Sequence, residues 1–449
     1  MTYTTKPALD HGQTVTTSDG ATYTVTQFLG RGGQGEVYRV RGADGEYALK
    51  WYHADSFLKK INADAFHKNI RRNVMRGMPK LSSGDTAMQF IWPRKLVDWQ
   101  LGSFGYLMQL FPAGYAPLSD VIMGRKRGAD GEETPLVWKS WFVRLTAALN
   151  LVRAFEILHA AGLSYQDLNE GGFSVNMDNG DVMICDCDNV SPDQTNLGIL
   201  GVLNYMAPEV ARREKLPDRF TDQYSLAVIL FRFFFHNHPM EGTESMALHA
   251  DPELSRRDAD LRIYGTAPHY CLDTRSRLNP PHRKAHADVR RLCRAYPTVL
   301  MQAFEQVFTR GVSDPMARLT ATEWRKTLLQ ARDCLIQVDG REMFCHTPAG
   351  RPLPDACRTL VYPSGRLVLC MPNKLLYSYH LNEYDADFKT PVGKIIDTVK
   401  PGVIGLYNGS QKPISAEYGG QARPCPPGGR TILLPGMKLR IGALTITVE

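Results

Sequence analysis

Three glycines, Gly30, Gly32 and Gly35, interrupt a run of alternating apolar residues in the segment LGRGGQGEVYRV at residues 29–40. Alternation of this kind predicts two antiparallel strands, and the glycines predict a tight turn between them. Such a turn leaves backbone N–H groups open to phosphate oxygens, because no Cβ stands in the way. A G-x-G-x-x-G motif also occurs at ordinary hairpin tips, so the residues that follow must separate the two interpretations.

A lysine follows this turn at a suitable distance. Lys50 ends the strand-like segment YALK, fifteen residues after Gly35. The sequence of strands and turns places its ammonium under the glycines, where it would act as a point charge on phosphate oxygens. Val37 and Ala48 would supply apolar cover for a purine. The alternative interpretation of Lys50 is a solvated lysine on an exposed strand.

The hydrophobic pattern changes along the chain. Residues 1–20 are polar and Thr-rich, and we expect a loose leader there. Short alternating runs over 22–50 predict an antiparallel meander, and helical spacing over 137–161 and 206–335 predicts a helical lobe. Beyond Gln337, about ten short alternating runs with Gly and Pro turns predict an all-β module.

The composition excludes several classes of protein. With 43% hydrophobic and 22% charged residues, long disorder is not expected. No stretch approaches the roughly 18 apolar residues of a membrane span, and YSLAVILFRFFF at 224–235 indicates a buried helix. The net charge of +7 is too dispersed to indicate nucleic acid. Nine scattered cysteines and no N-terminal apolar run predict a reduced, cytoplasmic location.

Five further segments carry a resemblance. They are HAAGLSYQDLNEGG (159–172), VMICDCD (182–188), YMAPE (205–209), DQYSLA (222–227) and DPMARLTATEW (314–324). In this order, after the glycine turn and Lys50, they resemble the eukaryotic-like protein kinase family over most of residues 22–335. The resemblance implies an α+β chain with a bilobal protein-kinase-like fold, a β-rich N-lobe and a helical C-lobe, followed by an all-β sandwich. The implied domains are the leader (1–20), a kinase domain (21–336) and the sandwich (337–449).

The resemblance also implies cofactors and roles. Asp167 would be the base that takes the substrate hydroxyl proton, Asp186 a magnesium ligand, and Arg318 the buried partner of Glu209. ATP would lie between the lobes, with its adenine at the backbone around Gln109 and Phe111, beyond Met108 as the gatekeeper residue. The residues implied in nucleotide binding are Gly30, Arg31, Gly32, Gly33, Gln34, Gly35, Val37, Ala48, Lys50, Met108, Gln109 and Phe111.

Several positions depart from the family pattern. Tyr165 and Gln166 replace its His-Arg pair, Asn169 replaces the lysine after the catalytic base, and Gly172 replaces the asparagine that binds a second metal. Gln166 offers no charge to an activation-loop phosphate, so we expect no dependence on one.

No glutamate occurs between Trp51 and Gln100, so the usual Lys–Glu pair of the small lobe cannot form. Asn69 and Lys68 stand nearest the expected position, and Asn69 could hydrogen-bond Lys50.

Asp188 offers a compensation. It lies two residues after Asp186, and in an extended segment both carboxylates would point to one side. Magnesium prefers such oxygen ligands, so Asp188 is a candidate metal ligand, with Asn169 or Glu170 as further candidates. The alternative is that Asp188 caps a turn with Asn189.

Other candidates are weaker. Cys185 and Cys187 have no second pair at metal spacing, and the His and Cys residues between 269 and 293 are irregularly spaced. The same part of the chain is the most basic, which suggests either an acidic partner or a solvated helical face. The C-terminal module weakly resembles the forkhead-associated sandwich but lacks its Ser-x-x-His signature, and Gly393-Lys394 is the only trace of its Gly-Arg element. We therefore expect an interaction module without phosphothreonine binding.

These observations lead to three hypotheses. The first is a cytoplasmic Ser/Thr protein kinase that uses ATP and Mg²⁺, with Asp167, Lys50 and Asn169 as catalytic residues. The second is a pseudokinase that binds nucleotide and regulates partners, and the third is an adaptor acting through the sandwich. The chain is similar to kinases of tellurium-resistance operons, which implies a protein substrate, a metal-dependent phosphatase and a von Willebrand-type protein as partners. We expect neither a nucleic-acid nor a membrane partner.

Overall fold

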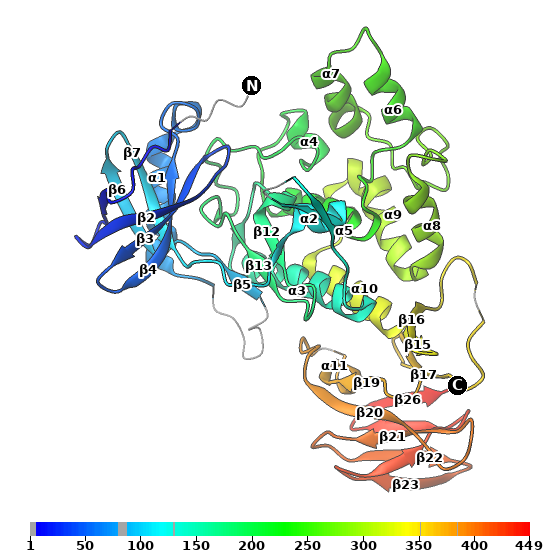
Figure 1. Cartoon of the computed structure of the whole chain (residues 1–449). Coiled ribbons are helices and arrows are strands. Elements are labelled where there is room, and N and C mark those ends of the chain that lie inside the picture. Colours follow the sequence, from blue (N-terminus) through cyan, green and yellow to red (C-terminus); the bar gives the residue numbers. More distant parts are fainter. Residues whose placement is uncertain (1–5, 80–87, 129–130, 351, 384) are drawn as a thin grey trace.

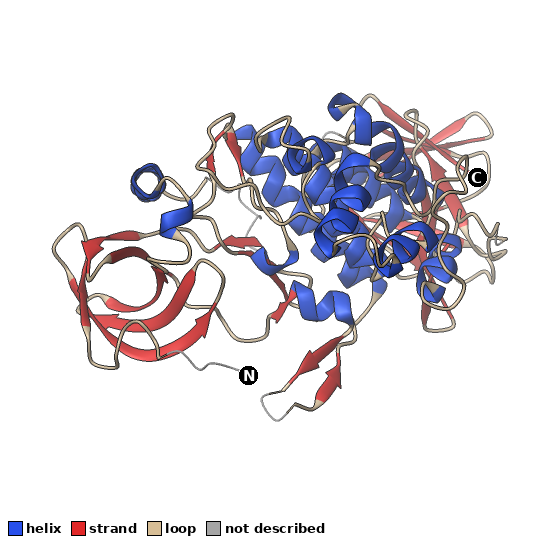
Figure 2. Cartoon of the chain, turned by 90° about the horizontal axis from the view of Figure 1, so that it is seen from above, coloured by secondary structure: helices blue, strands red, loops and turns tan. Residues whose placement is uncertain are grey.

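The computed structural model describes residues 6–79, 88–128, 131–350, 352–383 and 385–449. The fold is α+β, with a strand-rich N-terminal lobe, a helical lobe and a C-terminal β-sandwich (Figure 1). Seen from above, the strands of the first lobe gather at one end of the molecule and the helices of the second lobe lie beyond them (Figure 2). Within the described residues, no helix is long and apolar enough to span a membrane.

The N-terminal lobe is a six-stranded antiparallel sheet with α1 (Ala63–Arg76) beside it. In spatial order its strands are β1 (Thr14–Thr16), β2 (Thr22–Arg31), β3 (Gly35–Gly42), β4 (Gly45–Tyr52), β7 (Ser103–Met108) and β6 (Lys95–Gln100). The turn between β2 and β3 requires Gly35, because a Cβ there would lie 2.2 Å from the carbonyl oxygen of Trp51. Val37 pairs with Lys50, so the register of β3 and β4 brings the lysine to the glycine turn.

The loose leader expected over residues 1–20 is wrong for its described part. Val15 of β1 pairs with Tyr23 of β2 and is fully buried, and Leu9 is only 2% exposed. Both belong to an apolar cluster with Tyr23 and Tyr38 on the sheet. The Thr-rich segment therefore forms an edge strand, because its few apolar side chains complete this cluster.

The helical lobe is built on α3 (Trp141–Ala160) and α5 (Arg219–Phe235), which confirms the two helices expected there. Asp218 caps α5 by accepting hydrogen bonds from the N–H groups of Phe220 and Thr221, and nearly all of the helix is buried, as its apolar sequence predicts. The other helices are α2 (Leu118–Met123), α4 (Pro208–Ala211), α6 (Thr243–Ala250), α7 (Arg256–Leu261), α8 (Ala287–Ala295), α9 (Thr298–Ser313) and α10 (Ala321–Asp333).

Short strands position the loops of the candidate site. A four-stranded sheet runs in the order β5 (Met88–Phe90), β13 (Val182–Ile184), β12 (Phe173–Val175) and β8 (Ala116–Pro117). The paired strands β11 (Leu163–Ser164) and β14 (Ser191–Pro192) flank β12 and β13 in the sequence. A hairpin of β9 (Arg125–Arg127) and β10 (Glu133–Pro135) follows α2.

The change from helices to strands lies between α10 and β15. After the hairpin of β15 (Leu335–Val338) and β16 (Arg341–Phe344), two sheets enclose one apolar cluster and form the sandwich. The first contains β18 (Leu367–Cys370), β17 (Arg358–Val361), β26 (Leu444–Val448), β25 (Lys438–Ile441), β22 (Ile414–Tyr418) and β23 (Gln421–Cys425). The second contains β19 (Leu375–Tyr377), β20 (Pro391–Asp397), β21 (Ile404–Asn408) and β24 (Arg430–Ile432), with α11 (Ser378–Leu381) after β19.

A buried carboxylate joins the sandwich to α10. Asp333, the last residue of α10, accepts hydrogen bonds from Arg366 Nη2 at 2.6 Å, Tyr379 Oη at 2.9 Å and His380 Nε2 at 3.0 Å. These contacts hold the pKa of Asp333 well below its usual value, although burial alone would raise it. The sandwich is therefore fixed to the helical lobe through charged groups withdrawn from solvent.

Candidate active site

Lys50 is the centre of a polar cluster where the two lobes meet. Its ammonium donates hydrogen bonds to Gln34 Oε1 at 2.8 Å, Asp186 Oδ1 at 3.0 Å and Asp188 Oδ2 at 2.9 Å. The lysine is 6% exposed, so it is not the solvated strand residue that was the alternative. Burial alone would lower the pKa of Lys50, but the charges of Asp186 and Asp188 raise it well above its usual value.

Asp188 is fully buried, although its carboxylate and that of Asp186 contact the same ammonium of Lys50. Its Oδ2 accepts hydrogen bonds from Lys50 and, at 2.5 Å, from the hydroxyl of Tyr52, while Oδ1 accepts one from Tyr106 at 3.1 Å. Both oxygens are therefore engaged by protein donors. The prediction that Asp188 is a metal ligand is wrong for this arrangement, because no oxygen of its carboxylate is directed at an open position.

The backbone explains this error. The prediction assumed an extended segment, but β13 ends at Ile184 and Asp186 has a φ of +47°, in the left-handed region. A turn follows, in which the N–H of Asn189 donates to the carbonyl of Asp186 at 3.3 Å. The alternation of side chains is lost there, so Asp188 points into the N-terminal lobe while 45% of the Asp186 side chain is exposed.

Helix α1 contacts this turn through amides instead of a carboxylate. Asn69 donates to the carbonyl oxygens of Asp188 at 3.1 Å and Val190 at 2.9 Å, and Asn73 donates to Val190 at 2.8 Å. Each asparagine is 1% exposed. The expected hydrogen bond between Asn69 and Lys50 is therefore wrong: the side chain of Asn69 reaches the backbone of the turn.

Asp167 is largely buried beside the cluster. Burial and the charge of Asp186 raise its pKa, and a hydrogen bond from Asn169 opposes this shift. Nδ2 of Asn169 donates to Oδ1 of Asp167 at 3.1 Å and to its carbonyl oxygen at 3.0 Å. Asn169 therefore orients Asp167.

Helix α5 fixes the backbone of the loop before Asp167. Asp222 accepts hydrogen bonds from the backbone N–H groups of Tyr165 at 2.7 Å and Gln166 at 3.0 Å. Asp222 is 2% exposed, and both of its oxygens are used. The backbone that leads into Asp167 is thus fixed independently of any substrate.

Tyr165 and Gly172 share one space. The hydroxyl of Tyr165 donates to the carbonyl of Cys185 at 2.6 Å, and a Cβ built on Gly172 would lie 2.5 Å from the same hydroxyl oxygen. A side chain at residue 172 would therefore collide with the tyrosine. Tyr165 occupies the space that the asparagine expected at residue 172 would need, so these two departures from the family pattern depend on each other sterically.

Gln166 binds the segment after the aspartates with neutral hydrogen bonds. Its Nε2 donates to Ser191 Oγ at 2.6 Å and to the carbonyl of Thr195. Asn196 donates to its Oε1 at 3.3 Å. Residues 191–196 are thus bound to Gln166 by uncharged groups, in agreement with the absence of an arginine at residue 166.

The residues expected to cover a purine come together. Ala48 and Met108 face each other in register on β4 and β7 and are buried with Met183 and Cys185 of the helical lobe, while Val37 packs against the same cluster. Met183 was missed by sequence reasoning, because an apolar residue on a short strand resembles any core residue. The two lobes therefore contribute to one apolar surface next to Lys50.

Other expected nucleotide-binding residues are placed less uniformly. Gly30 lies in β2 and Gly35 begins β3, and Gly32 and Gly33 lie in the turn between them, where the N–H of Gly32 donates to the carbonyl of Gly35 at 2.8 Å. The guanidinium of Arg31 pairs with the buried Glu36 at 2.6 Å, so it does not face Lys50. Gln109 follows β7 and accepts a hydrogen bond from Arg94 at 2.9 Å, and Phe111 is 51% exposed.

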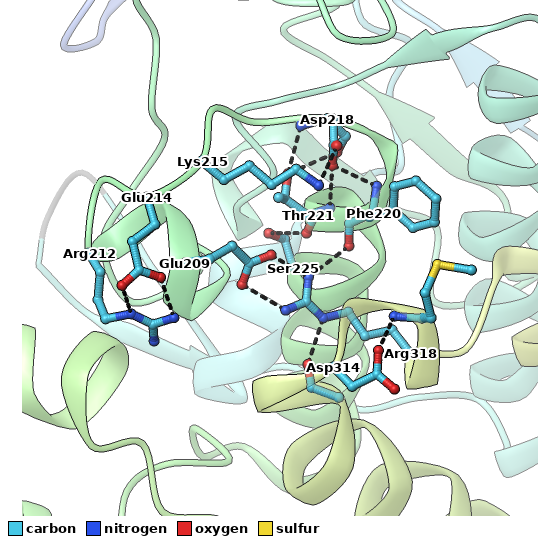
Figure 3. Close-up of polar contacts among 12 residues, drawn as sticks. Glu209, Arg212, Glu214, Lys215, Asp218, Phe220, Thr221, Ser225, Asp314 and Arg318 are labelled. Atoms are coloured by element: carbon cyan, nitrogen blue, oxygen red, sulfur yellow. Dashed lines mark hydrogen bonds and ion pairs between the residues drawn. The ribbon is translucent and has the colours of Figure 1, made fainter.

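Glu209 and Arg318 form the expected buried pair (Figure 3). Two parallel hydrogen bonds join the guanidinium to the carboxylate, at 2.7 Å and 2.8 Å. Arg318 also donates to the carbonyls of Gly311 at 2.7 Å and Phe220 at 3.1 Å, and its side chain has no exposed surface. This pair attaches α4 to the end of α9 and the start of α5.

Comparison with known proteins shows which proteins the chain is similar to. Residues 140–293 match the family model of the protein kinase domain. Over 210 residues the chain is 28% identical to serine/threonine-protein kinase MPS1 of Saccharomyces cerevisiae, covering 45% of this chain and 24% of that one. Over 340 residues it is 25% identical to protein kinase YegI of Escherichia coli, covering 72% and 47%. The chain thus spans less than half the length of these curated relatives.

Solved kinase structures also align. The PknI kinase domain of Mycobacterium tuberculosis is 18% identical with a TM-score of 0.43, over 72% of this chain and 98% of that one. Vaccinia related kinase 3 is 14% identical with a TM-score of 0.48, over 72% and 91%.

The residues present fit ATP and one divalent cation. The cluster offers an ammonium for phosphate and an apolar surface for a purine, and Asp186 has an exposed carboxylate of the kind that Mg²⁺ prefers. Among the described residues, no group of three or more His, Cys, Asp or Glu side chains could hold a metal by itself. Burial raises the pKa values of the Cys185 and Cys187 thiols, which disfavours the thiolate form that binds metals.

Proposed function

We propose that the chain is an ATP-dependent protein kinase that transfers the γ-phosphate to Ser or Thr hydroxyls of a protein partner. The observation that carries the proposal is the convergence of Lys50, Asp186 and Asp167, which come from three separate segments and interact electrostatically. The family match over residues 140–293 and the names of the relatives support a protein kinase.

In this function each residue has one task. Lys50 would bind phosphate oxygens, and Asp186 would hold Mg²⁺, which would neutralise phosphate charge. Asp167, with a raised pKa and an orientation fixed by Asn169, accepts the proton of the substrate hydroxyl. Bound ATP supplies the transferable phosphoryl group, and catalysis is positioning and charge neutralisation. The backbone of Gly30, Gly32, Gly33, Gln34 and Gly35 would cover the phosphates.

The test is transfer of radioactive phosphate from ATP to casein, an acidic protein, or to the chain itself. Lys50→Met should reduce transfer by roughly 10²–10³-fold, as expected when one charged contact to the reacting group is lost. Asp167→Asn should reduce it by about 10²–10⁴-fold with little change in ATP affinity. Equal transfer by the parent and by both variants would refute the assignment.

The structure gives one reason to keep a pseudokinase as a second candidate. Gly172 has no side chain to hold a second metal, and Tyr165 leaves no room for a side chain at residue 172. The pseudokinase would show a rise in melting temperature with ATP and Mg²⁺ but no transfer, because a ligand of the folded state stabilises it.

We also propose a role for the remainder of the chain. Residues 21–336 would be the kinase domain of a cytoplasmic protein, and residues 337–449 would be a forkhead-associated-like interaction module. The basic residues on and around α7 and α8 would favour an acidic partner, in line with a protein substrate. A metal-dependent phosphatase and a von Willebrand-type protein remain candidate partners.

A further inference from the structure

The N-terminal lobe contains a buried lysine and no glutamate in the segment that should pair with it. Between Trp51 and Gln100 the sequence has no glutamate, and α1 presents asparagines to the turn after β13. An unpaired buried ammonium is costly, because the low-polarity surroundings do not replace its hydration. Lys50 therefore needs a carboxylate from another element.

The carboxylate is supplied by the turn itself. Asp188 lies 2.9 Å from Lys50 and has no exposed side-chain surface, whereas Asp186, at 3.0 Å, is 45% exposed. The hydroxyls of Tyr52 and Tyr106 complete the hydrogen bonds of Asp188 from β4 and β7. All of these donors belong to the N-terminal sheet, so the carboxylate is inserted into that sheet from the helical lobe.

We propose that Asp188 is the positioning residue for Lys50, in place of a carboxylate on α1, and that Tyr52 and Tyr106 fix Asp188 in this role. Lys50 is then coupled directly to the turn that carries Asp186. Among the described residues, α1 is hydrogen-bonded to the same turn through Asn69 and Asn73, so its movement would not by itself break the ion pair of the lysine. The consequence for catalysis rests on the proposed kinase function, whereas the pairing does not.

A double-mutant cycle tests the pairing without any assay of transfer. In the full chain, Asp188→Asn and Lys50→Met should each lower the melting temperature, because each leaves a buried partner alone. The double variant should melt no lower than Asp188→Asn alone. The matched cycle of Lys50→Met with Asp186→Asn should show smaller coupling, since Asp186 is exposed to water.

A second measurement follows the ammonium itself. Lys50 is labelled with trinitrobenzenesulfonate at a fixed pH well below its pKa, and the initial rate of labelling is followed by mass spectrometry. Asp188→Asn should raise this rate at least about tenfold, because one unit of pKa corresponds to a tenfold change in the fraction of neutral amine. Asn69→Ala, which loses contacts to the same turn but not the carboxylate, should leave this rate unchanged. The exposed Lys59 serves as the internal reference.

The outcomes are separable. Additive losses in the cycle, or an unchanged labelling rate of Lys50 in Asp188→Asn, would overturn the proposal. A raised magnesium requirement for nucleotide binding in Asp188→Asn with no change at Lys50 would also overturn it and would restore Asp188 as a metal ligand. If Asp188→Asn alone does not fold, recovery of folding in the double variant supports the pairing and failure to recover refutes it. Absence of phosphate transfer by the parent would refute the kinase function but would leave these readouts intact.

Discussion

The replacement of Arg318 by alanine should destabilise the helical lobe strongly. The change removes both hydrogen bonds to Glu209 and those to the carbonyls of Gly311 and Phe220. Removing one partner of a buried ion pair costs about 3–5 kcal/mol, because the other charge stays behind without a partner. The side chain of Glu209 is 11% exposed and gains some hydration in the variant, so we expect the lower end, about 3 kcal/mol.

This loss should be visible in thermal unfolding. For a domain of this size, 1 kcal/mol corresponds to a shift of about 2–4 °C, so about 3 kcal/mol corresponds to a fall of about 6–12 °C. Differential scanning calorimetry of the full chain measures the shift. Arg318→Lys keeps the charge but loses the two parallel hydrogen bonds, so its melting temperature should lie between those of the parent and Arg318→Ala.

A nearby exposed pair provides the control (Figure 3). Nη2 of Arg212 lies 2.7 Å from Oε2 of Glu214, and 57% of the Glu214 side chain is exposed. Glu214→Gln should not change the melting temperature measurably, because water replaces the contact. A fall of less than about 2 °C for Arg318→Ala, no larger than that of the control, would refute the assignment of a stabilising role to the buried pair.

Three further predictions concern other contacts. Gly172→Ala should destabilise the fold, because the added Cβ meets the hydroxyl oxygen of Tyr165. Adding Tyr165→Phe should relieve that effect, and equal melting temperatures of Gly172→Ala and the double variant would contradict this. Gln34→Ala should tighten ATP binding by up to about tenfold in calorimetric titration, since a hydrogen bond to Lys50 no longer competes with phosphate; weaker binding would show that Gln34 helps to bind ATP. The pKa of His380 is lowered from 6.5 to about 4 by burial, so the unfolded chain takes up a proton that the folded chain does not. The free energy of unfolding should therefore fall by up to about 3 kcal/mol from pH 6.5 to pH 4. The fall should be smaller in His380→Gln, and an equal fall in the parent and the variant would exclude this histidine as the cause.

The sequence was sufficient for the residues that belong to ordered motifs. Lys50, Asp167 and Asp186 come together as expected, and Glu209 meets Arg318 across a sequence separation of 109 residues. These expectations succeeded because each motif fixes both a residue type and its place in a known order of strands and helices.

The contacts of Asp188 were not predictable from periodicity. Their position depends on the left-handed backbone at Asp186, and an aspartate in that conformation has no distinct sequence signal. Tyr52 and Tyr106 resemble ordinary aromatic residues of a sheet, so their hydroxyls gave no indication of a shared acceptor. Charge balance was the one usable signal: a buried lysine without a nearby glutamate requires a carboxylate from elsewhere, and Asp188 was the aspartate in excess.

The departures from the family pattern are coupled in pairs by space and charge. Tyr165 fills the volume that a side chain on Gly172 would need, so an asparagine at residue 172 requires a smaller residue at 165. Asp188 supplies the charge that α1 lacks, so a glutamate added to α1 would bring a third carboxylate to a lysine that is already paired with Asp186 and Asp188. Residue-by-residue comparison counts each departure as a loss, whereas the contacts show that in both pairs one change is the condition for the other. Activity in such a chain therefore cannot be judged from missing motif residues alone, because the residues that replace them lie in different segments.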